Sequence, residues 1–244
     1  MTETIPPAAE SAVAAFLLAD SRLPSGAYSH SAGLEPAVMA GLQADGVYPY
    51  LVSRLQSVVR METAAAVLAH RRAAVLAAGP PSGEHDGGGD PPAFAALEAA
   101  LDARTPSPAQ RDASRRLGRG MLRLALTLKA GNCAVATLKR EVPRPTRPVA
   151  LGVAAQALGV GELQLAKLCC YDDAQSVVAA ALKLLPIDPM SATAWILAAE
   201  PQINAVAHHA VQARTAEDIP ALSAPWMEHW AEDHTERTRR LFVA

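Results

Sequence analysis

Aromatic residues are scarce in this sequence: only 4% of its 244 residues are Phe, Trp or Tyr, although half are apolar. Ala, Leu and Val must therefore fill the core, and small side chains favour closely approaching helices over sheets. A chain of this length can bury roughly 70% of its unfolded surface in one domain. We therefore expect an all-α, single-domain antiparallel bundle of about eight to ten helices spanning 1–244.

Cysteine is also rare, and the numbers of positive and negative charges are nearly equal. Cys133, Cys169 and Cys170 are odd in number, include an adjacent pair that cannot easily bridge, and show no Cys-x-x-Cys spacing. This usage favours a reduced, cytoplasmic compartment. The 22 basic and 24 acidic residues give a net charge of -2, which removes the global attraction expected of a nucleic-acid binder. We therefore expect protein or small-solute partners and no nucleic acid.

Long apolar runs and nucleotide-binding motifs are missing. The apolar run at 12–19 is short, follows acidic residues and ends at Asp20, so it predicts a helix and not a signal peptide. No stretch reaches the roughly 18 apolar residues that a membrane span needs. Neither Gly-x-x-x-x-Gly-Lys-Ser/Thr nor Gly-x-Gly-x-x-Gly occurs. The sequence therefore predicts no membrane association, no NTPase activity and no cofactor.

Apolar residues recur at helical spacing through most of the chain. The clearest amphipathic helix follows the capped start at 105–108 and carries Leu117, Met121, Leu124 and Leu128 on one face. Six further helical segments are expected, at 10–20, from 31 to about 42, 49–78, 149–158, 162–185 and 190–214, the last with a kink at Pro201.

Two segments lack this periodicity. Residues 79–92 are almost all Gly, Pro, Ser and acidic residues, a composition that cannot offset its ordering entropy, so we expect a mobile surface loop. A domain linker is disfavoured because the helices on both sides need the same core. Residues 218–244 are polar and typical of a tail that orders on a partner. This tail has four isolated apolar anchors: Trp226, Trp230, Leu241 and Phe242.

Histidines and cysteines offer candidate metal ligands, but none in a convergent set. His208 and His209 are neighbours, and neighbouring helical side chains diverge by ~100°, so they cannot share one ion without other ligands. The same divergence applies to the adjacent cysteines, of which at least Cys170 is expected in the core. Glu200, Asn204 and His208 share one face of the expected helix. This face is either solvated or lines a water-filled passage. We expect no metal site.

A row of arginines marks the amphipathic helix that begins near residue 106. Arg111, Arg115, Arg119 and Arg123 recur every four residues, opposite the apolar face. Most such rows are solvated, although an acidic partner surface would also fit. The same row is the only candidate recognition helix for an alternative function, a helical DNA-binding transcriptional regulator, which would bind DNA in a gel shift at physiological salt.

Residues 23–35 gather polar groups around one helix start. They read Leu-Pro-Ser-Gly-Ala-Tyr-Ser-His-Ser-Ala-Gly-Leu-Glu, a rigid turn with two hydroxyl groups, a phenol, an imidazole and a carboxylate. Ser29 and Ser31 are candidate helix caps, and Glu35 complements the helix dipole. Capping explains Tyr28, His30 and Glu35 less well. A small hydrolase would instead use His30 and Glu35 as base and orienter for a serine nucleophile.

This segment closely resembles the N-terminal signature of the urease accessory protein F (UreF) family, Leu-Pro-x-Gly-x-Tyr/Phe-x-His-Ser-x-Gly-Leu-Glu. The resemblance covers nearly the whole chain. Four further segments follow family patterns in order: 114–124 (Ser-Arg-x-x-Gly-Arg-x-Leu-Leu-Arg-Leu), 148–152 (Pro-Val-Val-x-Gly), Tyr171 with 176–187 (Tyr-x-x-x-x-Ser to Val-Pro-Leu), and 240–242 (the Arg-Leu-Phe of Ser-Arg-Leu-Phe). Three positions depart from the family pattern and concern partner contacts: Thr146, Pro189 and Thr235.

The resemblance implies a cytoplasmic homodimer that is not an enzyme but a chaperone required for nickel insertion into urease. It implies that the protein binds the accessory protein UreD, also called UreH, and recruits the GTPase UreG. Nickel would pass to the urease apoprotein through a scaffold and tunnel without a tight metal site. The residues that carry the motifs are the candidate partner-binding or tunnel residues: Tyr28, His30, Ser31, Glu35, Arg119, Tyr171, Arg240, Leu241 and Phe242.

Overall fold

The computed structural model describes residues 11–20, 22–26, 29–79, 90–237 and 241–242. Over these residues the chain is all-helical and has no β-strand, as the scarcity of aromatic residues predicted. Within the same ranges, no helix is long and apolar enough to cross a membrane. Most of the loop expected at 79–92 lies outside the described residues.

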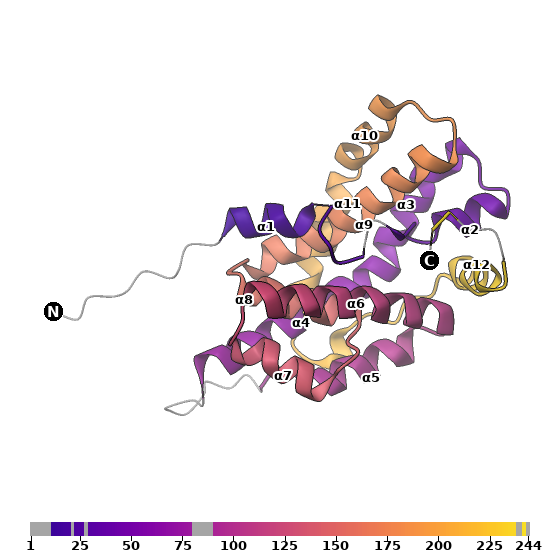
Figure 1. Ribbon diagram of the computed structural model, residues 1–244. Coiled ribbons are helices and arrows are strands. Elements are labelled where there is room, and N and C mark those ends of the chain that lie inside the picture. Colours follow the sequence, from indigo (N-terminus) through magenta and orange to yellow (C-terminus); the bar gives the residue numbers. More distant parts are fainter. Residues whose placement is uncertain (1–10, 21, 27–28, 80–89, 238–240, 243–244) are drawn as a thin grey trace.

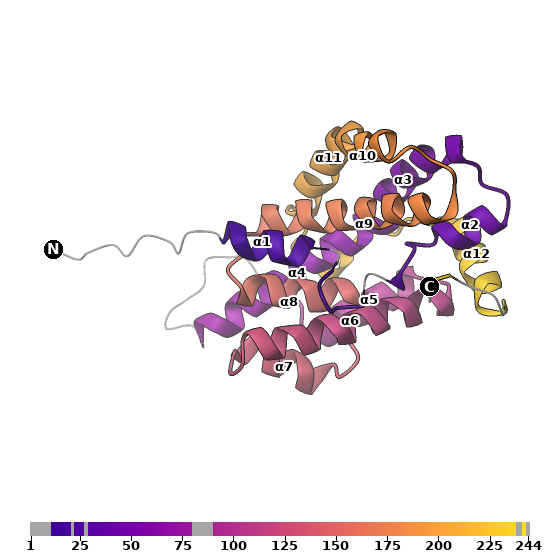
Figure 2. The same ribbon diagram turned by 45° about the horizontal axis from the view of Figure 1, so that its top comes forward.

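Three helices form the centre of the molecule (Figures 1 and 2): α4 (Val58–Ala78), α8 (Arg147–Ala157) and α9 (Glu162–Leu184). Every residue of α4 from 63 to 70 is buried, and so is every residue of α8 from 148 to 155. A Cβ added at Gly152 of α8 would lie 2.2 Å from the carbonyl oxygen of Ala66, so the two backbones nearly touch. Small residues thus bring these helices together.

The remaining helices pack around this centre. The first buried apolar cluster joins α4, α8 and the first half of α9 to α1 (Ala12–Ala19), α5 (Phe94–Arg104), α6 (Pro108–Leu128) and α7 (Cys133–Glu141), and it also includes Ala207 and Ala210. The second joins the other half of α9 to α2 (Leu34–Met39), α3 (Val47–Gln56), α10 (Pro189–Ala198), α11 (Glu200–Ala210) and α12 (Pro225–Thr235). Two short 3-10 helices, Ala44–Gly46 and Ala216–Asp218, complete the described fold.

Two helices expected to be continuous are each divided, so the described helices outnumber the eight to ten expected. The segment 49–78 breaks at Ser57, where φ is -120° and ψ is -93°. The segment 190–214 breaks at Ala199, and Pro201 lies in the first turn of α11 and does not kink a longer helix. An apolar repeat continues across a one-residue break, so periodicity cannot locate it.

Other boundaries agree more closely with the sequence. Ser107 caps α6 by accepting the N–H of Gln110 at 3.1 Å, and Met121 is buried as expected. Leu128 is 42% exposed because the apolar stripe leaves the core in the last turn of α6. The helix expected from 31 to about 42 covers only α2, since Gly33 has a left-handed backbone and precedes its first residue.

The C-terminal segment is partly folded onto the chain, whereas the sequence predicted isolated anchors. Phe242 is 5% exposed and lies in the second cluster, with the Lys183 Nζ 5.0 Å from its ring centroid. Trp230 on α12 packs near Tyr50, with ring centroids 6.5 Å apart. Trp226 stays 69% exposed and Leu241 64% exposed. Two of the four expected anchors are therefore free to contact another molecule.

Candidate functional site

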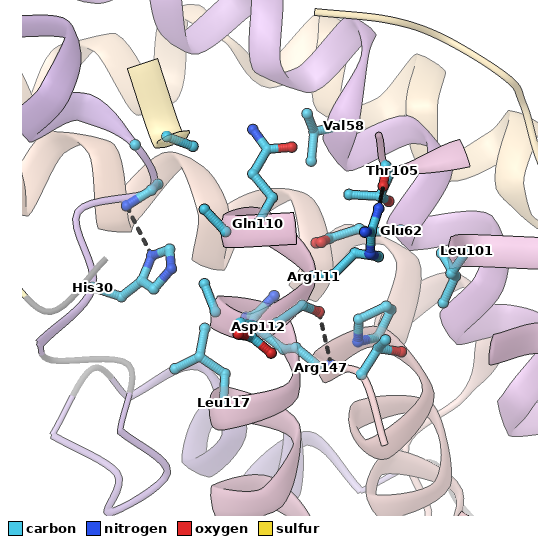
Figure 3. A pocket seen from close by; sticks show the side chains of 18 of the residues that line it. His30, Val58, Glu62, Leu101, Thr105, Gln110, Arg111, Asp112, Leu117 and Arg147 are labelled. Atoms are coloured by element: carbon cyan, nitrogen blue, oxygen red, sulfur yellow. Dashed lines mark hydrogen bonds between the residues drawn. The ribbon is translucent and has the colours of Figure 1, made fainter. Parts of the chain in front are cut away.

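A cavity of about 310 Å³ lies where α2, α4, α6, α9 and α12 meet (Figure 3). Val58, Leu101 and Leu117 supply apolar parts of its wall. Charged and titratable groups from several separate regions of the chain line it, among them His30, Arg54, Glu62, Arg147, Asp172, Asp173 and His234. The tertiary fold therefore assembles a polar chamber from residues that are far apart in sequence.

Two buried ion pairs form one wall of this cavity. Arg54 of α3 donates through Nε and Nη2 to the two carboxylate oxygens of Asp173, at 2.9 and 2.6 Å, and both side chains are only 9% exposed. Burial opposes the charge on Arg54, yet the attraction of Asp173 raises the pKa of this guanidinium. Arg147, in the first turn of α8, pairs with Asp172 beside it. Removing one member of such a pair leaves the other charge uncompensated.

Glu62 and His30 face the same cavity without an opposite charge bonded to them. Burial raises the pKa of the Glu62 carboxyl, and the attraction of Arg147 only partly opposes this. Burial, then the nearby cations Arg54 and Arg147, lower the pKa of His30 to about 4. The His30 Nδ1 accepts the N–H of Ala32 at 3.0 Å, a role that needs the neutral ring.

Glu35 of α2 fastens the C-terminal end of the chain. Its Oε1 accepts the N–H of Leu241 at 2.6 Å, and its Oε2 accepts the N–H of Phe242 at 2.9 Å. The same Oε2 contacts the Nε2 of His234 at 3.1 Å. Ser31 is fully buried, and its Oγ accepts the N–H of Glu35 at 3.3 Å in the first turn of α2, although the N-cap residue of this helix is Gly33 and not a serine. The fold thus joins the N-terminal signature to the last described residues.

Two glycines of α6 hold this helix against neighbouring backbone. A Cβ added at Gly120 would lie 2.0 Å from the carbonyl oxygen of Ser25, in the turn before α2. At Gly118 the added Cβ would lie 2.0 Å from the carbonyl oxygen of Pro145, before α8. The glycine in the Ser-Arg-x-x-Gly-Arg segment therefore has a steric reason, because any side chain there would force the helices apart.

The other predicted site residues are not gathered at the cavity. Arg119 is exposed on α6, and Tyr171 is 38% exposed on α9. Tyr28 and Arg240 lie outside the described residues. The cavity and the Glu35 contacts therefore unite His30, Ser31, Glu35, Leu241 and Phe242 but leave Arg119 and Tyr171 on separate surfaces.

The hydrolase arrangement is not formed. Glu35 contacts the C-terminal residues and not His30, whose Nδ1 is occupied by a backbone N–H. Ser29 donates its hydroxyl to the carbonyl oxygen of Gly26 at 3.0 Å, and the Ser31 hydroxyl oxygen accepts from the backbone. Among the described residues, His30 is not hydrogen-bonded to either serine, as a base that activates a serine nucleophile would be.

The candidate histidine and cysteine ligands differ in their exposure. His208 and His209 are exposed on α11, whereas Cys169 and Cys170 are buried. Burial raises the pKa of Cys170 to about 12, so its thiol is protonated near neutral pH. Across the described part of the chain, no group of three His, Cys, Asp or Glu side chains is placed to hold a metal ion.

The three departures from the family pattern have different surroundings. Thr146 is buried, and its N–H and Oγ1 both donate to Glu98 Oε1, at 2.8 and 3.1 Å. Pro189 is exposed in the first turn of α10. Thr235 is exposed at the end of α12 and borders the cavity. Thr146 therefore has an internal structural role, while the other two can contact a partner.

Sequence reasoning missed both buried ion pairs. A signal was present: Arg54 lies three residues after buried Leu51 on the same side of α3, and the acidic pair Asp172 and Asp173 interrupts the buried stripe of α9. Charged residues inside an apolar stripe are rarely buried unless they are paired. The pairing itself spans 119 residues for Arg54 and cannot be read from local pattern.

Sequence comparisons with known proteins place the chain in a family. The UreF family model matches residues 43–200. Urease accessory protein UreF of Mycobacterium sp. (strain JLS) is 36% identical over 231 residues, covering 93% of this chain and 96% of that protein. UreF of Mycolicibacterium vanbaalenii is 34% identical over 242 residues, covering 94% and 97%. UreF of Mycobacterium tuberculosis (strain ATCC 25177 / H37Ra) is 31% identical over 229 residues, covering 93% and 96%. The chain belongs to the UreF family of urease accessory proteins.

Proposed function

We propose that this protein is a non-enzymatic chaperone of urease maturation that binds UreD, recruits the GTPase UreG and supports nickel insertion into the urease apoprotein. The contact of Glu35 with Leu241 and Phe242 carries this proposal. It makes the two terminal motifs one structural unit, although they are more than 200 residues apart. A surface built from both ends of the chain is suited to recognise a partner and does no chemistry itself.

We propose that UreD binds the C-terminal segment, residues 218–244. Trp226 and Leu241 are exposed there, and large apolar side chains at the centre of an interface supply most of its binding energy. α12 and the Glu35 contacts hold the nearby backbone in place. The segment therefore presents anchors that are already oriented, which lowers the entropic cost of binding.

The cavity is suited to be part of a passage for the nickel cargo. It holds Glu62 and two arginine–aspartate pairs, so it is polar enough to keep water in contact with a passing ion. Its ligands are not convergent, which is consistent with transfer and not storage.

We further infer one antiparallel helical domain that acts as a homodimer in the cytoplasm. α9 contributes to both buried clusters and so ties the two halves of the fold together. Tyr171 and Leu163 are exposed on α9 and favour this helix as the dimer contact. The unpaired thiols favour a reducing compartment.

The test is co-purification of the full chain with UreD and UreG, together with nickel-dependent urease activity in cells that lack their own UreF. Trp226→Ala and Leu241→Ala should each weaken UreD binding by about 1 to 3 kcal/mol. Met190→Ala is the matched control, because Met190 is 80% exposed on α10 and is not part of the C-terminal segment 218–244. Failure of the native chain to bind either protein or to restore urease would refute the proposal.

A DNA-binding regulator is the second candidate, favoured by the exposed arginines of α6. A gel shift at physiological salt separates it from the chaperone, since only the regulator would select a duplex sequence.

A further inference from the structure

Charge is distributed unevenly along this nearly neutral chain. Residues 111–144 contain nine Lys or Arg and two Asp or Glu, a net charge of +7, whereas the whole chain has -2. The rest of the chain therefore carries -9. The basic segment forms α6, α7 and the residues up to the start of α8. A local field of this size attracts anionic surfaces even when the total charge is near zero.

Three arginines of this segment are exposed on one side of α6, and the first of them, Arg116, also borders the cavity. Arg116, Arg119 and Arg123 follow a spacing of three and four residues, which places them on one helix face about 10 Å long. All three are exposed, and none makes an ion pair or side-chain hydrogen bond with the residues that the structure describes. Figures 1 and 2 show α6 along the outside of the molecule.

Two of the four arginines of the predicted row, Arg111 and Arg115, serve the fold, and Arg116 was not part of that row. Arg111 donates to the carbonyl oxygens of Thr105 and Pro106, and Arg115 bonds both carboxylate oxygens of Asp102 at 2.7 Å. Arg111 and Arg115 therefore stabilise the fold, whereas Arg119 and Arg123 of the same row remain exposed.

The three exposed arginines make no such contacts with the described residues and repel each other. Like charges three or four residues apart destabilise a helix by roughly 0.2 to 0.5 kcal/mol per pair. Folding alone gives no reason for this arrangement. An external anion would remove the repulsion.

We propose that Arg116, Arg119 and Arg123 form a docking face for an acidic protein surface within the urease maturation assembly. The inference rests on the proposed function. It adds where on the protein one partner docks, which is α6, and what kind of surface that partner presents. Guanidinium groups match carboxylates through paired hydrogen bonds, which favours clustered Asp and Glu as the opposing groups. A nucleic acid is a weaker match, because the -9 on the rest of the chain would repel a long polyanion.

The experiment measures association of the full chain with purified UreD, UreG and urease apoprotein, each at 50 and 500 mM NaCl. The test variant is Arg119→Glu/Arg123→Glu. Its matched control is Arg22→Glu/Arg214→Glu, which changes two exposed arginines outside the basic segment by the same charge. We expect the test variant to associate about tenfold more slowly with one of the three proteins at 50 mM NaCl. The control should match the native chain, and the difference should shrink at 500 mM.

Further variants protect the test against misfolding. Arg119→Lys/Arg123→Lys keeps the charge and should retain most of the native association rate. If circular dichroism shows that the glutamate variant is unfolded, Arg119→Gln/Arg123→Gln takes its place, since it removes charge without reversing it.

Four results would overturn the inference. Equal association rates of the native chain and the test variant with every partner would refute the docking face alone. No binding of the native chain to any of the three proteins would refute the proposed function as well. Arginine-dependent binding of a 20-base-pair duplex at 150 mM NaCl, without any change in protein binding, would assign the face to nucleic acid. A change confined to sedimentation of the chain alone would assign it to a second copy.

Discussion

The contact between α4 and α8 and the layer around Glu35 are held by opposite kinds of interaction. Between α4 and α8, small residues bring two backbones together, and Gly152 leaves no room for a Cβ. Around Glu35, a carboxylate, a histidine and two backbone N–H groups join α2 to the end of the chain. The first region depends on shape and the second on directed polar bonds.

The comparison indicates how scaffold and site are divided. Close packing of small residues tolerates almost no change in volume and so gives a rigid centre. Buried polar bonds depend on every partner being present, and breaking one leaves unpaired groups. The cavity lies on the polar side of this division, beside Arg54 and Asp173.

The largest expected effect comes from breaking the buried ion pair. Arg54→Met should destabilise the protein by about 3 to 5 kcal/mol, because Asp173 would remain buried without its partner. The double variant Arg54→Met/Asp173→Leu should recover most of this loss, since both charges are then absent. Urea denaturation of the native, single and double variants measures the difference. A double variant as unstable as the single one would show that the pair does more than balance charge.

The second effect tests the apolar region. Gly152→Val should cost about 2 to 3 kcal/mol, because its side chain would collide with the carbonyl of Ala66. Ala136→Val, at an exposed position of α7, is the control and should cost only a few tenths of a kcal/mol. Thermal denaturation compares them. If the two variants melt alike, the close approach of α4 and α8 is not rigid.

The third effect concerns the polar layer. Glu35→Ala removes the acceptor for two backbone N–H groups and should cost about 1 to 3 kcal/mol, mostly local to the C-terminal residues. Limited proteolysis should then cut the segment after α12 faster, while hydrogen exchange in α4 and α8 stays unchanged. Urease activation should fall more than the melting temperature does. A large fall in melting temperature, with uniformly faster exchange, would make Glu35 a purely structural residue.

Deleting residues 226–244 would remove more than an independent docking tail. Phe242 would leave the second apolar cluster, and Glu232, which accepts hydrogen bonds from Ser107 and the N–H of Ala109, would no longer cap α6. We therefore expect the truncated chain to lose stability as well as UreD binding, unlike the single changes Trp226→Ala and Leu241→Ala. Equal denaturation midpoints of the truncated and full chains would contradict this.

The sequence was sufficient for the all-helical class, most helix positions and the capped start of α6, because periodicity and capping are local signals. It could not locate the breaks at Ser57 and Ala199, which interrupt the backbone but not the apolar repeat. The resemblance to the UreF family indicated Glu35 and Phe242 as candidate partner-binding residues, but as two unconnected ones. Their contact spans 207 residues, so only tertiary structure shows it. The ion pairs were missed for the same reason.

The smallest expected effect is a pH dependence of the free energy of unfolding that originates in His30, in the polar wall of the cavity. The unfolded chain titrates this histidine near 6.5, whereas the folded chain does so at about 4. Between these values the unfolded chain binds more protons, so the free energy of unfolding decreases as pH falls from 6.5 to 4. Because His30 is only half-buried, we expect its share to be about 1 to 2 kcal/mol, with no contribution from further change above 6.5 or below 4.

His30→Asn keeps an acceptor for the N–H of Ala32 and removes the titrating ring. The variant should therefore lose less stability than the native chain between pH 6.5 and 4, and carboxyl groups that titrate in both proteins cancel in the difference. His209→Asn, at an exposed position of α11, is the control and should follow the native curve. Urea denaturation across this pH range measures all three proteins. Parallel curves for the native chain and His30→Asn would mean that the cavity wall accommodates a charged imidazole, and that the polar layer tolerates protonation without opening.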